Sequence, residues 1–313
     1  MARTGEPLRL NRHDIREKGS TMSTARLGYL GMGLMGLPMS LRLRAAGCGL
    51  AVWNRSAAKA EPARAAGARV AASPADVARE ADIIFMCLTD AAAVEEVAFG
   101  ANGLASVPGQ GKVVVDFSSI TPAATRDIAA RLAAANGMRW MDAPVSGGTK
   151  GAEEGSLAIM AGGSQEDYER VRPYVQHMAQ RFTLMGPLGA GQTTKLCNQI
   201  IVGGTMAILA EATRLAANAG IDPMLLPQAL AGGFADSKPL QLFLPRMAQG
   251  VHHPPIGHTY TMLKDLDSVV ELARQTGTPV PMTAVASQMF RLVNATLGPE
   301  SEALEIYKLS DRR

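Results

Sequence analysis

The predicted fold depends first on residues 27–36, which read Leu27-Gly28-Tyr29-Leu30-Gly31-Met32-Gly33-Leu34-Met35-Gly36. A short apolar run leads into a G-x-G-x-x-G motif, and a helical pattern over residues 37–46 follows at once. Strand, glycine turn and helix in this order are the context that a dinucleotide-binding turn requires. Because glycines allow a tight turn and close approach to the helix N-terminus, we expect residues 31–36 to seat a pyrophosphate. An ordinary glycine-rich turn is the alternative interpretation of the motif alone.

The second predicted strand, over residues 50–53, ends in Asn54-Arg55. A cofactor with a free ribose 2′-hydroxyl usually meets an acidic residue here, about 20 residues after the glycines. A carboxylate would repel a 2′-phosphate, whereas a guanidinium binds it through two hydrogen bonds. We therefore predict that Asn54 and Arg55 contact the cofactor, and that it is NADP, with NAD as the weaker alternative. The other interpretation of Arg55 is a surface residue of a turn.

Strand and helix patterns alternate up to residue 185. Strands are predicted at 83–88, 113–116, 139–142, 157–161 and 182–185, with a weak one starting at Val70, and helices at 74–81, 122–135 and 166–178. The continuous apolar run at 83–88 is typical of a buried parallel strand. Leu88 and Thr89 end this strand, and Ser118 and Ser119 follow the next one. At the carboxyl edge of the sheet they are predicted to contact ribose or nicotinamide, or else their hydroxyls cap helices.

A serine followed by two glycines, Ser146-Gly147-Gly148, comes after the strand at 139–142. Successive backbone N–H groups in such a turn form a nest that binds anions. We therefore predict that these three residues hold a substrate carboxylate. A mobile glycine turn is the alternative.

One long helix is predicted over residues 192–219, where no proline interrupts a run rich in Ala, Leu, Ile and Met. At 1.5 Å per residue it would run roughly 40 Å, long enough to lie between two domains. Lys195 lies in its first turns, where the helix dipole and burial would both lower the pKa of the amine. Asn198, three residues on, shares the same helix face. An ammonium beside an amide suits protonation of a carbonyl oxygen, and a solvated lysine is the alternative.

The rest of the chain shows helical patterns at 223–231, 237–249, 261–275 and 281–297, with no strand alternation. The predicted organisation is a disordered tail over residues 1–24 and a Rossmann-type α/β domain over residues 25–187. An all-α C-terminal domain over residues 188–313, starting with the interdomain helix, completes it. Its apolar faces exceed what a small helical domain can bury alone, which predicts a homo-oligomer.

Together these motifs resemble the β-hydroxyacid dehydrogenase family. The resemblance covers residues 26–308 and rests on the segments 27–39, 142–148 and 189–198, which come in the family's order. It implies that Lys195 is the general acid–base group and that Asn198 orients both Lys195 and the substrate. It also implies that Lys264, in the pair Lys264-Asp265, reaches the substrate and the nicotinamide side of the cleft, and that the oligomer is a dimer or tetramer.

The resemblance implies reversible hydride transfer between NADPH and a small semialdehyde or 3-hydroxy acid. Residues 116–119, 194–199 and 232–237 look closest to the 2-hydroxy-3-oxopropionate (tartronate semialdehyde) reductases, although many of those carry an acidic residue where this chain has Asn54. The alternatives within the family are 3-hydroxyisobutyrate dehydrogenase and glyoxylate/succinic semialdehyde reductase. Outside it, Lys195 argues against an imine reductase, and the complete set of motifs argues against a catalytically silent NADP-binding scaffold.

Composition narrows the class of protein further. The 313 residues include 31 Lys plus Arg against 28 Asp plus Glu, with no basic run interleaved with aromatics, so we expect no nucleic-acid partner. Three widely spaced cysteines suggest a reducing cytosol and neither a disulfide framework nor a metal site. Residues 1–24 lack the apolar run of a signal peptide, and the apolar stretch near residues 200–210 is too short to span a membrane. We therefore expect a cytoplasmic protein without a membrane partner.

Overall fold

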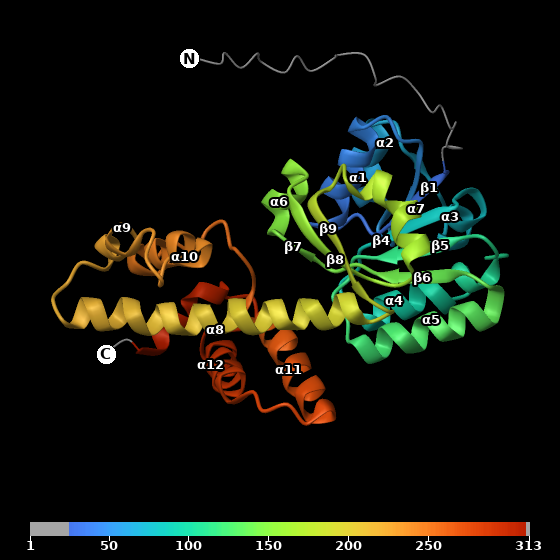
Figure 1. The fold of residues 1–313 in the computed structure, drawn as a ribbon. Coiled ribbons are helices and arrows are strands. Elements are labelled where there is room, and N and C mark those ends of the chain that lie inside the picture. The colour runs from blue at the N-terminus through green and yellow to red at the C-terminus, as the bar shows by residue number, and fades with distance from the viewer. Residues whose placement is uncertain (1–24, 311–313) are drawn as a thin grey trace, which may run out of the picture.

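The computed structural model describes residues 25–310, so the predicted tail over residues 1–24 lies outside the described part of the chain. In Figure 1, one end of the molecule is a sheet covered by helices. A long helix, α8 (Ala190–Asn218), leads away from this sheet. Further helices surround the far part of α8. The predicted α/β domain, long helix and helical C-terminal region are therefore confirmed.

The sheet is built from β1 (Leu27–Leu30), β2 (Leu50–Trp53), β3 (Arg69–Val70), β4 (Ile83–Met86), β5 (Val113–Asp116), β6 (Arg139–Asp142), β7 (Val145–Ser146), β8 (Leu157–Gly162) and β9 (Ala179–Gly186). Its order is β3-β2-β1-β4-β5-β6-β8-β7, and β9 pairs with β8. The pairs from β3 to β6 are all parallel, whereas β8 runs antiparallel to β6 and β7. The order 3-2-1-4-5-6 reverses direction between β1 and β4, the position where a Rossmann sheet binds its ligand.

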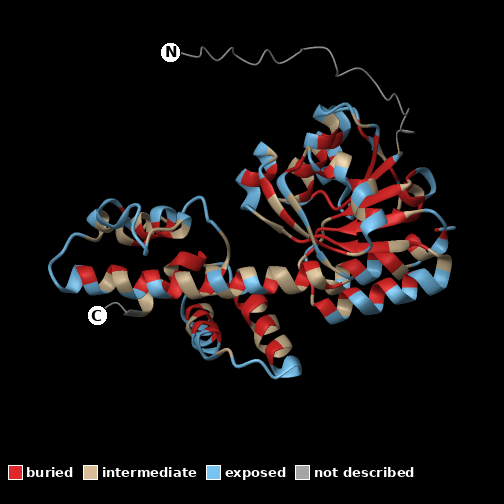
Figure 2. Ribbon diagram, in the orientation of Figure 1, coloured by how far each residue is buried: buried red, intermediate tan, exposed pale blue. Residues whose placement is uncertain are grey.

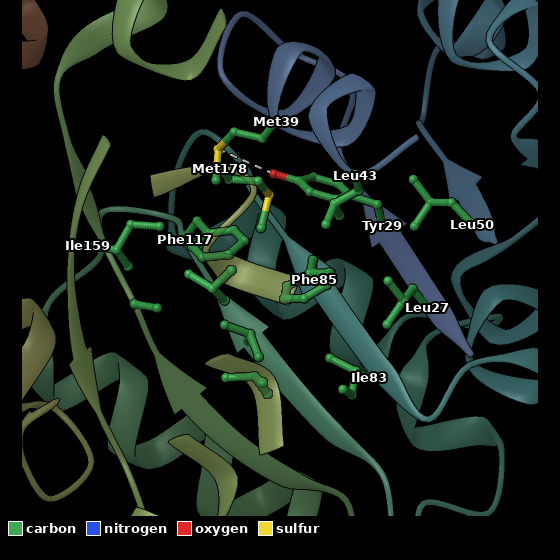
Figure 3. Close-up of a cluster of buried hydrophobic side chains, with 14 of the residues drawn as sticks. Leu27, Tyr29, Met39, Leu43, Leu50, Ile83, Phe85, Phe117, Ile159 and Met178 are labelled. Carbon is green, nitrogen blue, oxygen red and sulfur yellow. Dashed lines mark hydrogen bonds between the residues drawn. The ribbon is translucent and has the colours of Figure 1, made fainter. Parts of the chain in front are cut away.

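Both faces of the sheet are covered. One face packs against α3 (Pro74–Glu80), α4 (Ala91–Phe99) and α5 (Pro122–Asn136). The other packs against α1 (Gly36–Ala45), α2 (Glu61–Ala65), α6 (Gly148–Glu154) and α7 (Gln165–Val175). The second of these cores contains a cluster of three fully buried rings from Tyr29, Phe85 and Phe117, whose centroids lie 5.7–6.4 Å apart (Figure 3). Burial on both faces explains why β1, β4 and β5 are apolar without alternation.

Three helices of this domain, α2, α4 and α6, were missed by the sequence prediction. The sequence signal for α4 is Asp90, a residue type that is favoured as a helix N-cap. In the structure its carboxylate caps α4 by accepting a hydrogen bond from the Ala93 amide at 2.8 Å. Helix α6 begins at Gly148, and glycine disfavours helix strongly enough to hide the pattern.

Helix α8 has 29 residues and starts two residues before its predicted N-terminus. Gly203 and Gly204 do not break it. A Cβ at Gly203 would lie 3.0 Å from the Leu266 side chain, so glycine permits the close approach of α11 (Thr259–Thr276), whereas Gly204 faces open space. Contrary to the expectation from sequence, α8 is long and apolar enough to cross a membrane, with a mean hydropathy of 1.4 in an 18-residue window. The core helix of a soluble protein passes the same test, and α8 carries the packing of the C-terminal helices.

The C-terminal helices pack around α8. They are η3 (Pro223–Leu225), α9 (Leu226–Leu230), α10 (Lys238–Gln249), α11, α12 (Pro281–Leu297) and η4 (Ala303–Ser310). Their shared core includes Met206 of α8 with Leu244, Leu266, Phe290 and Ile306. Figure 2 shows that buried and exposed residues alternate along α8. All four helices predicted here are present, the first as a 3₁₀ turn joined to a short α-helix, and η4 was not predicted.

Candidate active site

The glycine turn between β1 and α1 has the shape that a dinucleotide needs. Gly31 has φ +97°, and a Cβ there would lie 2.2 Å from the Cys87 carbonyl oxygen. A Cβ at Gly36 would lie 2.0 Å from the Gly31 carbonyl oxygen, so only glycine fits at either position. A Cβ at Gly33, in contrast, would meet nothing within 4 Å, which leaves the turn open on the side where a pyrophosphate would approach the helix N-terminus. The predicted cofactor residues Met32, Leu34 and Met35 lie in the same turn.

The loop after β2 joins this turn. The Asn54 side-chain oxygen accepts a hydrogen bond from the Met32 amide at 2.8 Å, and its NH₂ donates to the Ser56 carbonyl at 2.8 Å. Asn54 therefore fixes the glycine turn to the loop after β2. Arg55 is exposed and forms no hydrogen bond or ion pair with any residue between 25 and 310, so its guanidinium is available to a ligand phosphate.

The four predicted contacts at the ends of β4 and β5 have different roles in the structure. The buried Ser118 hydroxyl accepts a hydrogen bond from the Leu88 amide at 2.9 Å, which ties the two strand ends together. Thr89 is exposed and its hydroxyl donates to Asp90. Ser119 accepts a hydrogen bond at its backbone carbonyl from Lys264 at 3.2 Å. The helix caps are Asp90 and Thr121, so the suggestion that Thr89, Ser118 or Ser119 caps a helix is wrong.

Ser146, Gly147 and Gly148 form the turn from β7 into α6. Gly147 has φ +133° and Gly148 has φ +64°, and both are exposed. The first N–H groups of a helix lack partners within the helix, and the exposed turn leaves space for an anion beside those of α6.

Lys195 lies beside this turn. Its Nζ atom donates a hydrogen bond to the Val145 carbonyl oxygen at 3.0 Å. Burial lowers the pKa of Lys195, the positive charge of Lys264 lowers it further, and the carboxylate of Asp265 opposes the shift. The pKa of Lys195 is therefore lowered, as predicted, and desolvation is the largest cause of this shift.

Asn198 is connected to α11 instead of to Lys195. Its NH₂ donates to the Gln199 side-chain oxygen at 2.8 Å, and its oxygen accepts from the Ser146 hydroxyl at 3.5 Å. Gln199 in turn donates to Asp265 at 2.7 Å. The other Asp265 oxygen lies 3.4 Å from the Lys264 amine. The structure therefore places Ser146, Lys195, Asn198 and Lys264 in one site. Gln199 and Asp265 also belong to it, although neither was predicted from sequence as a site residue.

Asp142, at the end of β6, holds the N-terminus of α8. Its two carboxylate oxygens accept hydrogen bonds from the Gly189 and Gln192 amides, each at 2.7 Å. The Gln192 side chain donates to the Ser118 carbonyl at 2.7 Å, so α8 is also attached to the end of β5. These residues place Lys195 against the sheet edge. From sequence, Asp142 ends a predicted strand and begins the segment 142–148, but its contact with α8 was not predicted, because a cap supplied from another strand has no local signal.

Asp116 lies next to Asp142 in the sheet register. It is fully buried, and one of its oxygens accepts a hydrogen bond from the Ser118 amide at 2.9 Å while the other has no partner among residues 25–310. Burial raises the pKa of Asp116 to about 7, and the neighbouring Asp142 carboxylate adds to the shift. The described residues contain no group of three or more His, Cys, Asp or Glu placed to hold a metal ion.

Two family models divide the chain between them. One, described as the NAD binding domain of 6-phosphogluconate dehydrogenase, matches residues 26–186. The other, described as "NAD-binding of NADP-dependent 3-hydroxyisobutyrate dehydrogenase", matches residues 189–310.

Individual proteins agree with these models. The chain is 38% identical to 2-hydroxy-3-oxopropionate reductase of Escherichia coli over 88% of this chain and 93% of that protein. It is 32% identical to glyoxylate/succinic semialdehyde reductase 2 of Arabidopsis thaliana over 88% of this chain and 76% of that protein. The solved structure of Mycobacterium tuberculosis 3-hydroxyisobutyrate dehydrogenase with L-serine superimposes with a TM-score of 0.83 at 27% identity, over 92% of this chain and 100% of that one. The chain therefore belongs to the β-hydroxyacid dehydrogenase family of NAD(P)-dependent oxidoreductases, as its motifs predicted.

Proposed function

We propose that the protein reduces a small semialdehyde with NADPH and oxidises the corresponding 3-hydroxy acid in reverse, with 2-hydroxy-3-oxopropionate as the favoured substrate. The observation that carries the proposal is the position of Lys195. A partly buried amine with a lowered pKa lies between the Ser146–Gly148 turn and Lys264, on an α/β scaffold with an open dinucleotide turn. The 38% identity to a 2-hydroxy-3-oxopropionate reductase supports the choice of substrate.

The residues divide the work as follows. A reduced nicotinamide supplies a hydride to the carbonyl carbon when it is bound. The charge that develops on the substrate oxygen requires a proton donor, and the Lys195 ammonium provides the proton in reduction and recovers it in oxidation. The free N–H groups at Gly147 and Gly148, with the Ser146 hydroxyl, hold the substrate carboxylate. Lys264 bonds the Ser119 carbonyl and so holds α11 against the cofactor side of the cleft.

A substrate panel tests the proposal. Purified enzyme would be assayed by NADPH absorbance with 2-hydroxy-3-oxopropionate, glyoxylate, succinic semialdehyde and methylmalonate semialdehyde, and in reverse with the hydroxy acid that corresponds to each. We expect the highest kcat/KM for 2-hydroxy-3-oxopropionate. A higher value for another semialdehyde would move the assignment to one of the alternatives within the family. An absence of turnover with every compound would favour the NADP-binding scaffold.

We propose NADP over NAD because Arg55 is uncommitted and no carboxylate stands in its place at the end of β2. Arg55→Ala should weaken NADPH binding by roughly 1.5–3 kcal/mol, the range for a hydrogen bond to a charged group, and leave NADH nearly unaffected. Fluorescence titration of both cofactors measures the difference. Equal losses for the two would show that Arg55 does not recognise the 2′-phosphate.

We also propose that the protein is a cytoplasmic homodimer or homotetramer. Each chain would divide near residue 187 into a cofactor domain and a helical domain. The change from one family model to the other between residues 186 and 189 supports the boundary. Exposed apolar side chains on α8 support the oligomer.

A further inference from the structure

The hydrogen bonds between α11 and α8 form a directed chain. Asp265 accepts from Gln199 at 2.7 Å, Gln199 accepts from Asn198 at 2.8 Å, and Asn198 accepts from Ser146 at 3.5 Å. Asp265 and Gln199 are buried, at 6% and 7% exposure, so each depends mainly on its protein partner. Every member of the chain is therefore constrained by its neighbour.

The chemistry of Asp265 determines the direction of the chain. An ionised carboxylate only accepts hydrogen bonds, whereas an amide side chain has one end that donates and one that accepts. The NH₂ of Gln199 must therefore face Asp265, which leaves its oxygen to face Asn198. The NH₂ of Asn198 must then face Gln199, and its oxygen is left to face Ser146 and the cleft.

We propose that Asp265 is a positioning residue that acts through Gln199 to hold the amide of Asn198 with its oxygen toward the reaction site. This inference rests on the proposed function, and it assigns the acceptor role to Asn198. The amines of Lys195 and Lys264 and the backbone N–H groups of the Gly147–Gly148 turn are donors. In the structure, the Asn198 oxygen accepts a hydrogen bond from the Ser146 hydroxyl. During turnover it would accept a hydrogen bond from one N–H of the Lys195 ammonium, so that another N–H of Lys195 points at the substrate oxygen.

Exchanging the carboxylate at position 265 with the side-chain amide at position 199 tests the proposal. Asp265→Asn removes the obligatory acceptor, so the side-chain amides of Gln199 and Asn198 can both flip, and kcat should fall by about tenfold or more. In the double variant Asp265→Asn with Gln199→Glu, the carboxylate introduced at position 199 accepts both from the amide introduced at position 265 and from the NH₂ of Asn198. The Asn198 oxygen is then directed to the cleft again, and most of the lost kcat should return.

Asp267→Asn is the matched control, because Asp267 lies two residues away on α11 and pairs with Arg291 and Ser287 outside the site. It should keep wild-type kcat. Wild-type kcat in Asp265→Asn, or a loss that the double variant does not recover in a folded protein, would overturn the proposal. Should Asp265→Asn fail to fold, Gln199→Met breaks the same chain at equal length, and wild-type kcat in that variant would equally overturn it.

A second readout does not depend on the substrate. In protein labelled with ¹⁵N at asparagine, the Asn198 side-chain NH₂ signal, identified by its loss in Asn198→Asp, should be protected from exchange in the wild type. It should lose that protection in Asp265→Asn and regain it in the double variant. An unprotected signal in the wild type would overturn the relay even if the proposed function holds, whereas a protected signal in an enzyme without turnover would contradict only the proposed function.

Discussion

The first ten residues of α8 and the rest of the helix have opposite surroundings. Between residues 190 and 199, the polar side chains of Gln192, Lys195, Asn198 and Gln199 are hydrogen-bonded to one another, to strand ends or to α11. Further along, three large apolar side chains are exposed, Ile201 by 68%, Ile208 by 56% and Leu215 by 72%. We therefore expect the first segment to contact small molecules, and the proposed oligomer would cover the exposed apolar side chains of the second.

The largest expected effect comes from removing the amine in the first segment. Lys195→Met keeps most of the side-chain length and removes the proposed proton donor, so kcat should fall by roughly 10²–10⁴, the contribution of one general acid. NADPH affinity should change by no more than severalfold, because Lys195 bonds the Val145 carbonyl and not the glycine turn. Steady-state kinetics and cofactor titration measure the two quantities.

Lys112 supplies a matched control at the other edge of the sheet. It is also a partly buried lysine bonded to a backbone carbonyl, that of Ala81 at 2.6 Å, and burial also lowers its pKa. Lys112→Met should therefore leave kcat unchanged. If both variants lost turnover equally, the effect would come from burial of a lysine and not from catalysis.

The lowered pKa of Lys195 also predicts the sign of the pH dependence. Reduction needs the ammonium, so its rate should be complete below the Lys195 pKa and decline as pH rises through it. Oxidation needs the neutral amine and should rise over the same range. That range should lie below the ordinary lysine value, because desolvation disfavours the charged form. A pH–rate profile of wild type in both directions is the measurement, and the residual rate of Lys195→Met should show neither step.

The next effect, on the free energy of unfolding, concerns the attachment of residues 190–199 to the sheet. Asp142→Ala leaves the buried Gly189 and Gln192 amides without acceptors, at about 1–3 kcal/mol each, so the free energy of unfolding should fall by about 2–6 kcal/mol. Asp90→Ala removes an ordinary exposed cap from α4 and should cost only about 1 kcal/mol. Urea unfolding compares the two. Equal losses would mean that the position of Asp142 between sheet and helix has no special importance.

The same contrast explains what the sequence could predict. Residues whose role depends on local pattern, such as the glycine turn and the long helix, were predicted with small errors at their ends. The sequence also placed Lys195 in the first turns of the long helix, because that position depends only on order along the chain. It could not predict that Asp142 caps a helix 47 residues later or that Asp265 bonds Gln199 across 66 residues, since such pairs form only after the domains pack. Ser118 was predicted to face the cofactor, but its hydroxyl is buried between two strand ends.

The smallest effect on turnover is expected from a substitution in the apolar stripe. We define this stripe as Ile201, Ile208 and Leu215. The three residues repeat every seven positions, close to two helical turns, so they lie on one face of α8, and Gly204 between them leaves open space for a close neighbour. A symmetric contact buries the same residue from both copies. At about 1.5–3 kcal/mol for each buried isoleucine, Ile208→Ser should raise the dissociation constant of a dimer by roughly a hundredfold or more.

Light scattering over a range of concentrations would show the shift toward monomer, and the free energy of unfolding of the monomer itself should change little because Ile208 is already exposed in one copy. Met185→Ser, which alters a side chain of β9 that is 46% exposed and lies outside the stripe, should leave the mass unchanged. A monomeric wild type at micromolar concentration would remove the basis for contrasting the two parts of α8. So would an oligomer that Ile208→Ser leaves intact, because the second part of α8 would then be an exposed surface without a partner.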